Sequence, residues 1–133
     1  MRKLSLLLIA LFWLVVPAKA QEFLDPVSWK LEVEHKQDQD YTILIKVDIE
    51  PGWHIYSQEE ADIEFPPIPT EFVFNNSPDT YELVGKTIEP DVEPEYDEVF
   101  EEYIVFFSDK VIFKQDIRVI NPENLQIDVE MGF

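Results

Sequence analysis

The chain has 133 residues with 28 acidic against 10 basic side chains, a formal net charge of −18, and no cysteine. This charge argues against nucleic acid and anionic lipid as partners, because both need cationic side chains facing phosphate. The lack of cysteine excludes disulfide bonds and thiol chemistry by the chain itself, and the aromatic and β-branched content is too high for a disordered protein.

Residues 1–20 have the pattern of a cleavable export signal. Arg2 and Lys3 precede an apolar run at 4–16, Pro17 ends the run, and Ala18-Lys19-Ala20 offers a small-x-small cleavage site. Thirteen apolar residues would cover about 20 Å as a helix, less than the ~30 Å of a hydrocarbon core, so an uncleaved anchor is the less favoured alternative. We therefore expect an exported protein whose mature part, residues 21–133, is a single domain.

The mature part keeps all 28 acidic residues but only seven of the basic ones, which gives a net charge of −21. Such a surface permits basic partners or divalent cations. With three glycines far apart, at positions 52, 85 and 132, no phosphate-binding loop can form. The sequence predicts neither a cofactor nor a metal as a resident group.

After the signal the sequence alternates with period two and shows no helical pattern. Turn-forming residues, such as Pro51-Gly52 and Asn121-Pro122, separate the runs at short spacing. About eight half-apolar strands predict an all-β domain of two antiparallel sheets packed face to face, with a closed barrel as the main competitor. The predicted strands are residues 27–34, 41–49, 53–56, 71–74, 81–86, 103–107, 111–119 and 125–131.

Residues 89–102 are the most acidic stretch, with eight acidic side chains among fourteen residues. Its two prolines disfavour helix, so we expect a long extended excursion across the sheet edge, with Val99 and Phe100 touching the domain. Calcium binding is an alternative, but the glycine and the Asp/Asn spacing of an EF-hand loop are missing. A solvated loop is the favoured interpretation.

His35 and His54 are the only histidines, too few to suggest a zinc site without further converging ligands. His35 lies beside a charged turn and is expected to be exposed, whereas His54 should be packed and hydrogen-bonded. A hydrolase triad of His54, Ser57 and an Asp would need a nucleophile turn that the sequence does not contain. No self-sufficient active site is predicted.

The most distinctive string runs from Pro51 to Ser57 and reads Pro-Gly-Trp-His-Ile-Tyr-Ser. Pro51 and Gly52 predict a turn, after which Trp53, Ile55 and Ser57 share one face of a strand and His54 and Tyr56 the other. The expected role of the string is structural, with Trp53 as a buried core anchor.

At this string the sequence resembles the N-terminal domain of DsbD, the thiol:disulfide interchange protein of the bacterial envelope. The family motif here includes Pro51, Gly52, Trp53, His54 and Tyr56. Further pieces follow the family's order over nearly all of the mature chain. They are Pro26 to Trp29, Pro69-Thr70, Tyr81 to Lys86, Tyr96-Asp97 with Phe100, and a strand at 111–119 with Phe113 and Gln115.

The resemblance implies an immunoglobulin-like sandwich in the periplasm. It also implies transfer of reducing equivalents from the DsbD-type membrane domain to periplasmic thioredoxin-like proteins through a cysteine pair. In the family a short cap loop with an aromatic ring shields that pair, and Asp97, Glu98 and Phe100 occupy this place here. Glu101 stands where a glycine is common in that loop.

The departure from the family is the missing cysteine pair, which would follow a strand resembling residues 125–131. Two hypotheses compete. The first is a redox-shuttle domain that is C-terminally incomplete, since the sequence stops at Phe133 within a predicted strand. The second is a cysteine-free binding module that docks a basic partner or a cation on its acidic loop, anchored by Phe100. Neither version can exchange disulfides with its own side chains.

Overall fold

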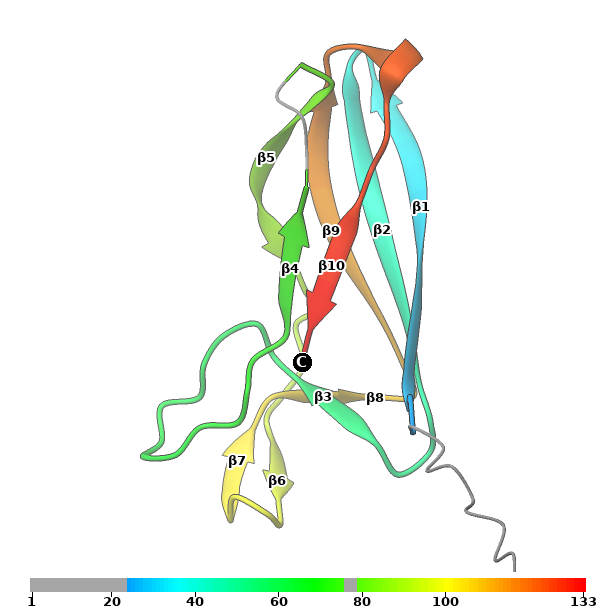
Figure 1. Ribbon diagram of the computed structural model, residues 1–133. Helices are drawn as coiled ribbons and strands as arrows, with labels where there is room; N and C mark the ends of the chain where they lie inside the picture. The colour runs from blue at the N-terminus through cyan, green and yellow to red at the C-terminus, as the bar shows by residue number, and fades with distance from the viewer. Residues whose placement is uncertain (1–23, 76–78) are drawn as a thin grey trace, which may run out of the picture.

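A computed structural model describes residues 24–75 and 79–133 of the chain (Figure 1). The predicted signal peptide, residues 1–20, lies outside the described residues. Within the described ranges, no helix combines the length and the apolar character needed to cross a membrane.

The largest element is a four-stranded antiparallel sheet in the order β1-β2-β9-β5 (Figure 1). Its strands are β1 (Val27–Gln37), β2 (Asp40–Ile49), β9 (Lys110–Val119) and β5 (Tyr81–Ile88). Alternate apolar residues of β2 and β9 face the same side, where Ile43, Ile45 and Phe113 are fully buried. The period-two pattern thus places the core on one face of this sheet.

A second, smaller layer covers that face. It consists of β4 (Glu71–Phe74) paired antiparallel with β10 (Val129–Gly132). The ring of Phe72 lies 4.8 Å from that of Phe113, and Val129 joins the same apolar core. The predicted antiparallel sandwich is confirmed. The alternative of a closed barrel is wrong, because β1 and β5 stand at opposite edges of an open sheet.

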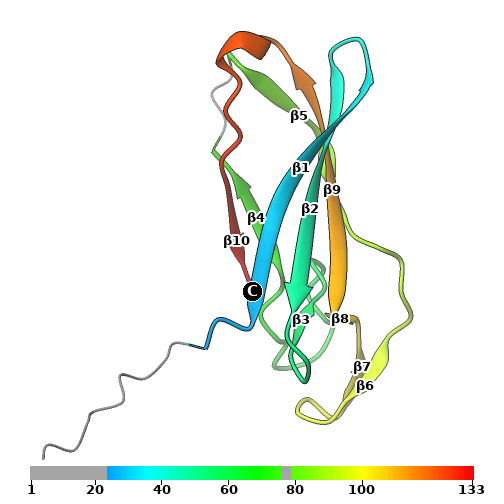
Figure 2. The same cartoon turned by 90° about the vertical axis from the view of Figure 1, so that its right-hand side faces the viewer.

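Two short strand pairs form one end of the molecule, beyond the sandwich (Figure 2). β3 (His54–Tyr56) pairs with β8 (Phe106–Ser108), and β6 (Glu95–Asp97) pairs with β7 (Glu102–Ile104). We call the region formed by these four strands and the loop 57–70 the tip. The loop closes on β3, because Thr70 donates to the carbonyl of Tyr56 from its hydroxyl at 2.6 Å and to that of Ser57 from its amide at 3.2 Å.

Three sequence predictions differ from this structure. The strand expected at 103–107 is divided between β7 and β8, because the Val105 carbonyl turns to accept the amide of Ser57 at 3.1 Å. Of the strand expected at 125–131, only the end belongs to β10, and a 3₁₀ turn at Pro122–Asn124 precedes it. The acidic stretch 89–102 is no continuous excursion, since its second half forms β6 and the turn into β7.

Candidate functional site

The candidate site lies at the tip, where strand β3 meets the β6–β7 hairpin. The hydroxyl of Tyr56 donates a 2.7 Å hydrogen bond to Oδ2 of Asp97. Nε2 of His54 lies 2.8 Å from the same hydroxyl and 3.4 Å from Oδ2 of Asp97. One histidine, one phenol and one carboxylate therefore form a compact polar triangle between two segments that are distant in sequence.

Asp97 also shapes the turn of its own hairpin. Its Oδ1 accepts the backbone amides of Val99 at 2.8 Å and of Phe100 at 3.1 Å, the pattern of an Asx turn. Glu101 then takes a positive φ of 55°, the left-handed conformation that glycine adopts at least cost. This turn therefore reaches the left-handed conformation with a glutamate and not with the more permissive glycine.

The environment holds Asp97 ionised. Burial raises the pKa of its carboxyl, but the hydrogen bonds from Tyr56, Phe100 and Val99, together with the nearby His54, outweigh burial and leave that pKa below its ordinary value. Burial, followed by the hydrogen bond to and the negative charge of Asp97, raises the pKa of Tyr56. The pair is therefore a neutral phenol that donates to a carboxylate.

Aromatic rings pack around the triangle. The ring of Phe100 meets that of Tyr56 edge-on at 5.7 Å, and Phe106 lies 4.6 Å from His54. Phe100 is half-buried at the mouth of a groove of about 390 Å³. The groove is lined by His54, Ile55, Tyr56, Pro66, Pro67, Ile68, Phe100 and Phe133. This groove is mostly apolar, with its polar groups at one wall.

The structure separates the predicted cap-loop residues. Asp97 and Phe100 contact Tyr56, whereas Glu98 and Val99 are exposed, so the expected packing of Val99 against the domain is wrong. Glu98, at the hairpin turn, points into solvent. Val99 also faces solvent, because the Asx turn of Asp97 reverses the chain there.

The residues of the string from Pro51 to Ser57 have different roles in the structure. Pro51 and Gly52 form the predicted turn, in which the amide of Trp53 donates to Glu50 O at 3.0 Å and Gly52 has φ 84°. Trp53 is 46% exposed, so its prediction as the buried core anchor is wrong. Ile55, 1% exposed, fills that role because strand β3 begins only at His54 and turns its next residue inward. His54 is packed and hydrogen-bonded, as predicted.

Sequence reasoning missed one anchor of the tip. The carboxylate of Glu89 accepts the Ser57 hydroxyl and, at 2.8 Å, the amide of Gln58. Ser57 is thereby engaged away from His54, which agrees with the rejection of a hydrolase triad. Nothing in the local sequence distinguishes Glu89 from the seven other acidic residues of its stretch.

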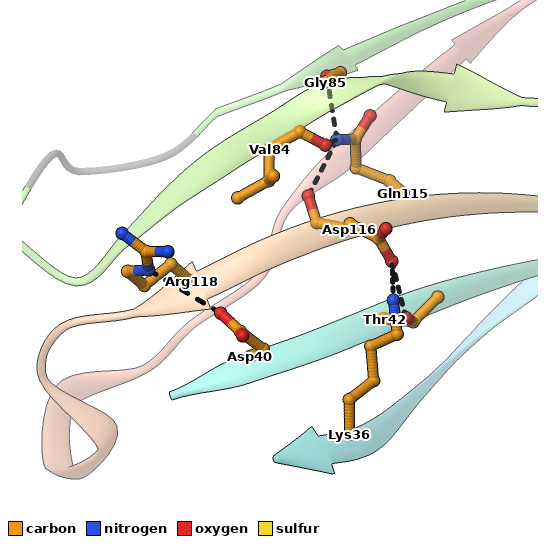
Figure 3. A network of polar contacts seen from close by, with 8 residues as sticks. All are labelled: Lys36, Asp40, Thr42, Val84, Gly85, Gln115, Asp116 and Arg118. Carbon is orange, nitrogen blue, oxygen red and sulfur yellow. Dashed lines mark hydrogen bonds and ion pairs between the residues drawn. The ribbon is translucent and has the colours of Figure 1, made fainter. Parts of the chain in front are cut away.

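A second polar cluster joins β1, β2, β9 and β5 in the main sheet (Figure 3). Nε2 of the buried Gln115 donates to the carbonyls of Asp116, Gly85 and Val84, and its Oε1 accepts Thr87. The carboxylate of Asp116 accepts Thr42 at 2.7 Å and Lys36 at 3.0 Å. These groups hydrogen-bond to one another, so the cluster ties the four strands together.

The acidic stretch does not converge on a metal. In residues 24–75 and 79–133, no group of three or more His, Cys, Asp or Glu side chains is arranged to hold an ion. The calcium alternative gains no support from this geometry.

Comparison of the chain with protein families, curated proteins and solved structures found no match in any of the three.

Proposed function

We propose that this chain is the folded body of a periplasmic thiol–disulfide shuttle domain of the DsbD N-terminal type, with the thiols supplied from outside the printed sequence. One observation carries the proposal. Strand β3, from the Pro-Gly-Trp-His-Ile-Tyr-Ser string, and the cap-like segment meet at the tip through the Tyr56–Asp97 hydrogen bond, with Phe100 edge-on to Tyr56.

The chemistry explains why such a tip suits a shuttle. A thiolate attacks a partner disulfide only when the partner approaches closely, and a mixed disulfide must then resolve against a second thiol. An aromatic cap and an apolar groove shield such sulfur atoms from water and offer a small docking surface. Small, weakly held surfaces are typical of redox encounters. The partners on this proposal are periplasmic thioredoxin-like proteins and a DsbD-type membrane domain.

Titration of the isotope-labelled protein with an oxidised thioredoxin-fold protein tests the docking part of the proposal by NMR. Weak binding should shift the resonances of His54, Tyr56, Ile68 and Phe100, which surround the groove. Ile68→Glu places a charge on the groove wall at a side chain that is 72% exposed, so it should abolish the shifts without unfolding the protein.

Leu83→Glu is the matched control, because Leu83 is also exposed, at 42%, but lies on β5 away from the tip. Shifts that appear elsewhere, or that survive Ile68→Glu, would remove the support for docking at this groove. Sequencing the gene beyond codon 133 tests the redox part. A continuation without cysteines would leave the proposal without its chemistry.

A cysteine-free binding module is the second candidate function, favoured by the surface of the β6–β7 hairpin. Tyr96 and Tyr103 are 52% and 72% exposed, lie edge-on at 5.5 Å, and are surrounded by the exposed glutamates 95, 98, 101 and 102. Such a surface fits a basic partner through charge and cation–π contacts. Salt should weaken that binding strongly, and Glu98→Gln/Glu102→Gln should reduce it, whereas Ile68→Glu should not.

A further inference from the structure

Strand β1 is a long and open edge of the main sheet. It runs for 11 residues and ends the strand order β1-β2-β9-β5, and within residues 24–75 and 79–133 it pairs with β2 on one side only. In Figure 1 it forms the right-hand border of the sandwich. Exposed strand edges of this kind readily pair with another strand, and the inference below is independent of the proposed function.

The core-facing side of β1 is only partly covered. Trp29, Leu31 and Val33 lie on the same side as the buried Val47, Ile45 and Ile43 to which they pair. Trp29 is nevertheless 37% and Val33 44% exposed, and Leu31 is intermediate. The smaller β4–β10 layer therefore leaves an apolar strip uncovered along the open edge.

The other main edges of the described sandwich are protected. In β5 the pairing with β9 shifts register between Val84 and Ile88, where Gly85 has φ 72°, and such a bulge disrupts the edge. β10 has only four residues. β1 is much longer, and its one irregularity lies at its end, between His35 and Gln37.

We propose that two copies of the chain associate through β1, antiparallel and about a twofold axis at Leu31, so that the two main sheets become one continuous sheet. In this register Lys30 faces Glu32 of the second copy twice, on the solvent side. Trp29 faces Val33 twice, on the apolar side, and Leu31 faces Leu31. Opposite charges and aromatic–β-branched pairs are the cross-strand contacts that stabilise antiparallel pairs.

Charge and side-chain alternation select this register. A shift by one residue places apolar side chains opposite charged ones on both faces. An axis at Lys30 or Glu32 brings two like charges face to face, and an axis at Val33 places Glu32 opposite Glu34 twice. The Leu31 register avoids each of these conflicts. An axis at Trp29 avoids them too but places Lys30 opposite Ser28, so of these axes only that at Leu31 pairs opposite charges.

The edge is also neutral in a strongly acidic protein. Lys30 and Lys36 balance Glu32 and Glu34 along the exposed side of β1, and Glu32 is already ion-paired with Lys46 of β2. Two copies can therefore approach along this edge without bringing their excess negative charge together. At about 0.15 M salt, charges more than roughly 8 Å away are largely screened.

Sedimentation equilibrium of the purified protein, from micromolar to millimolar concentration, measures the association. Lys30→Glu should weaken dimerisation about tenfold or more, because it creates two Glu–Glu contacts across the axis. It should leave the monomer folded, since residue 30 pairs with Lys46 of its own chain and becomes oppositely charged to it. Lys30→Glu/Glu32→Lys should restore dimerisation.

Lys114→Glu is the control for net charge, because it makes the same change on the exposed face of β9, two strands from the edge. It should leave the dimer constant nearly unchanged. A protein that stays monomeric throughout, or one in which both single variants act alike, would overturn the proposal.

Disulfide trapping reads the register directly, because the chain has no cysteine of its own. Residues directly opposite on antiparallel strands have Cα atoms about 4.5–5.5 Å apart, within the range that a disulfide spans. Leu31→Cys should therefore give a covalent dimer rapidly under mild oxidation, and Val33→Cys, displaced from the axis, only slowly. Equal rates, or faster trapping at position 33, would reject the Leu31 axis.

Discussion

The hydroxyl of Tyr56 lies 2.7 Å from the carboxylate of Asp97, 41 positions further along the chain. This contact ties the short strand β3 to the β6–β7 hairpin. Asp97 is 4% exposed, so the hydrogen bond satisfies a buried charge. The junction between β3 and the β6–β7 hairpin therefore depends on the hydrogen bonds that this carboxylate accepts.

Tyr56→Phe should lower the free energy of unfolding by about 1.5 kcal/mol, because it removes a hydrogen bond to a charged and buried acceptor. His54 is near enough to Asp97 to compensate in part. Urea unfolding measures the loss. Tyr103→Phe, at a phenol that is 72% exposed, should stay within about 0.5 kcal/mol of the wild type, and an equal loss in both variants would refute the proposed role of Tyr56.

The lowered pKa of Asp97 makes the free energy of unfolding depend on pH in the acidic range. That pKa is lower in the folded than in the unfolded chain, so its contribution is fully present above the unfolded value, about 3.9, and is lost as the pH falls through the folded value. Wild-type protein should therefore lose stability below about pH 4 more steeply than Asp97→Asn. Urea unfolding between about pH 2 and 6 compares the two slopes. Parallel curves would contradict the assignment.

Phe100→Ala distinguishes a capping ring from a core ring. Phe100 is half-buried and meets Tyr56 edge-on, so its loss should cost no more than about 1 kcal/mol. Phe113→Ala, at a ring with no exposed surface, should cost about 3–5 kcal/mol. Equilibrium unfolding measures both variants. A loss above about 3 kcal/mol in Phe100→Ala would make Phe100 a core residue and reject the cap interpretation.

The main sheet could be predicted because its strands are long and covered on one face. In β9 every second residue is buried, and in β2 the apolar residues 43, 45, 47 and 49 are buried, so the sequence carries the period directly. Strand β6 and the turn into β7 could not be predicted, because they have no apolar alternation, and Asp97 holds the turn by accepting the amides of Val99 and Phe100. A three-residue strand gives too short a pattern to detect.

The candidate site could be predicted only in part. The sequence places His54 and Tyr56 on one face of a predicted strand, and the resemblance to the DsbD family singles out Asp97 and Phe100 as cap-like residues. Only the structure brings these two groups together. The anchoring of Ser57 by Glu89 depends on a contact over 32 positions, which no local signal reveals. The exposure of Trp53 follows from the turn at Gly52, which delays the start of β3 by one residue.

The side chain of Gln115 should be a major polar contributor to the sandwich. It is 1% exposed and bonds the carbonyls of Val84 and Gly85 at 3.4 and 3.2 Å, which ties the bulged part of β5 to β9 (Figure 3). Gln115→Leu keeps a similar volume but leaves these carbonyls and the Thr87 hydroxyl without their buried partner. Each lost hydrogen bond contributes about 0.5–1.5 kcal/mol net, so the free energy of unfolding should fall by about 2–3 kcal/mol.

Hydrogen exchange should locate this loss, with the amides of β5 losing protection before those of β2. Gln126→Leu makes the same chemical change at an exposed side chain whose bonds reach only Asp128, and it should shift stability by less than about 0.5 kcal/mol. If Gln115→Leu proved neutral or stabilising, the apolar contacts of β5 alone would suffice to hold it on β9. The polar cluster would then be dispensable for the fold.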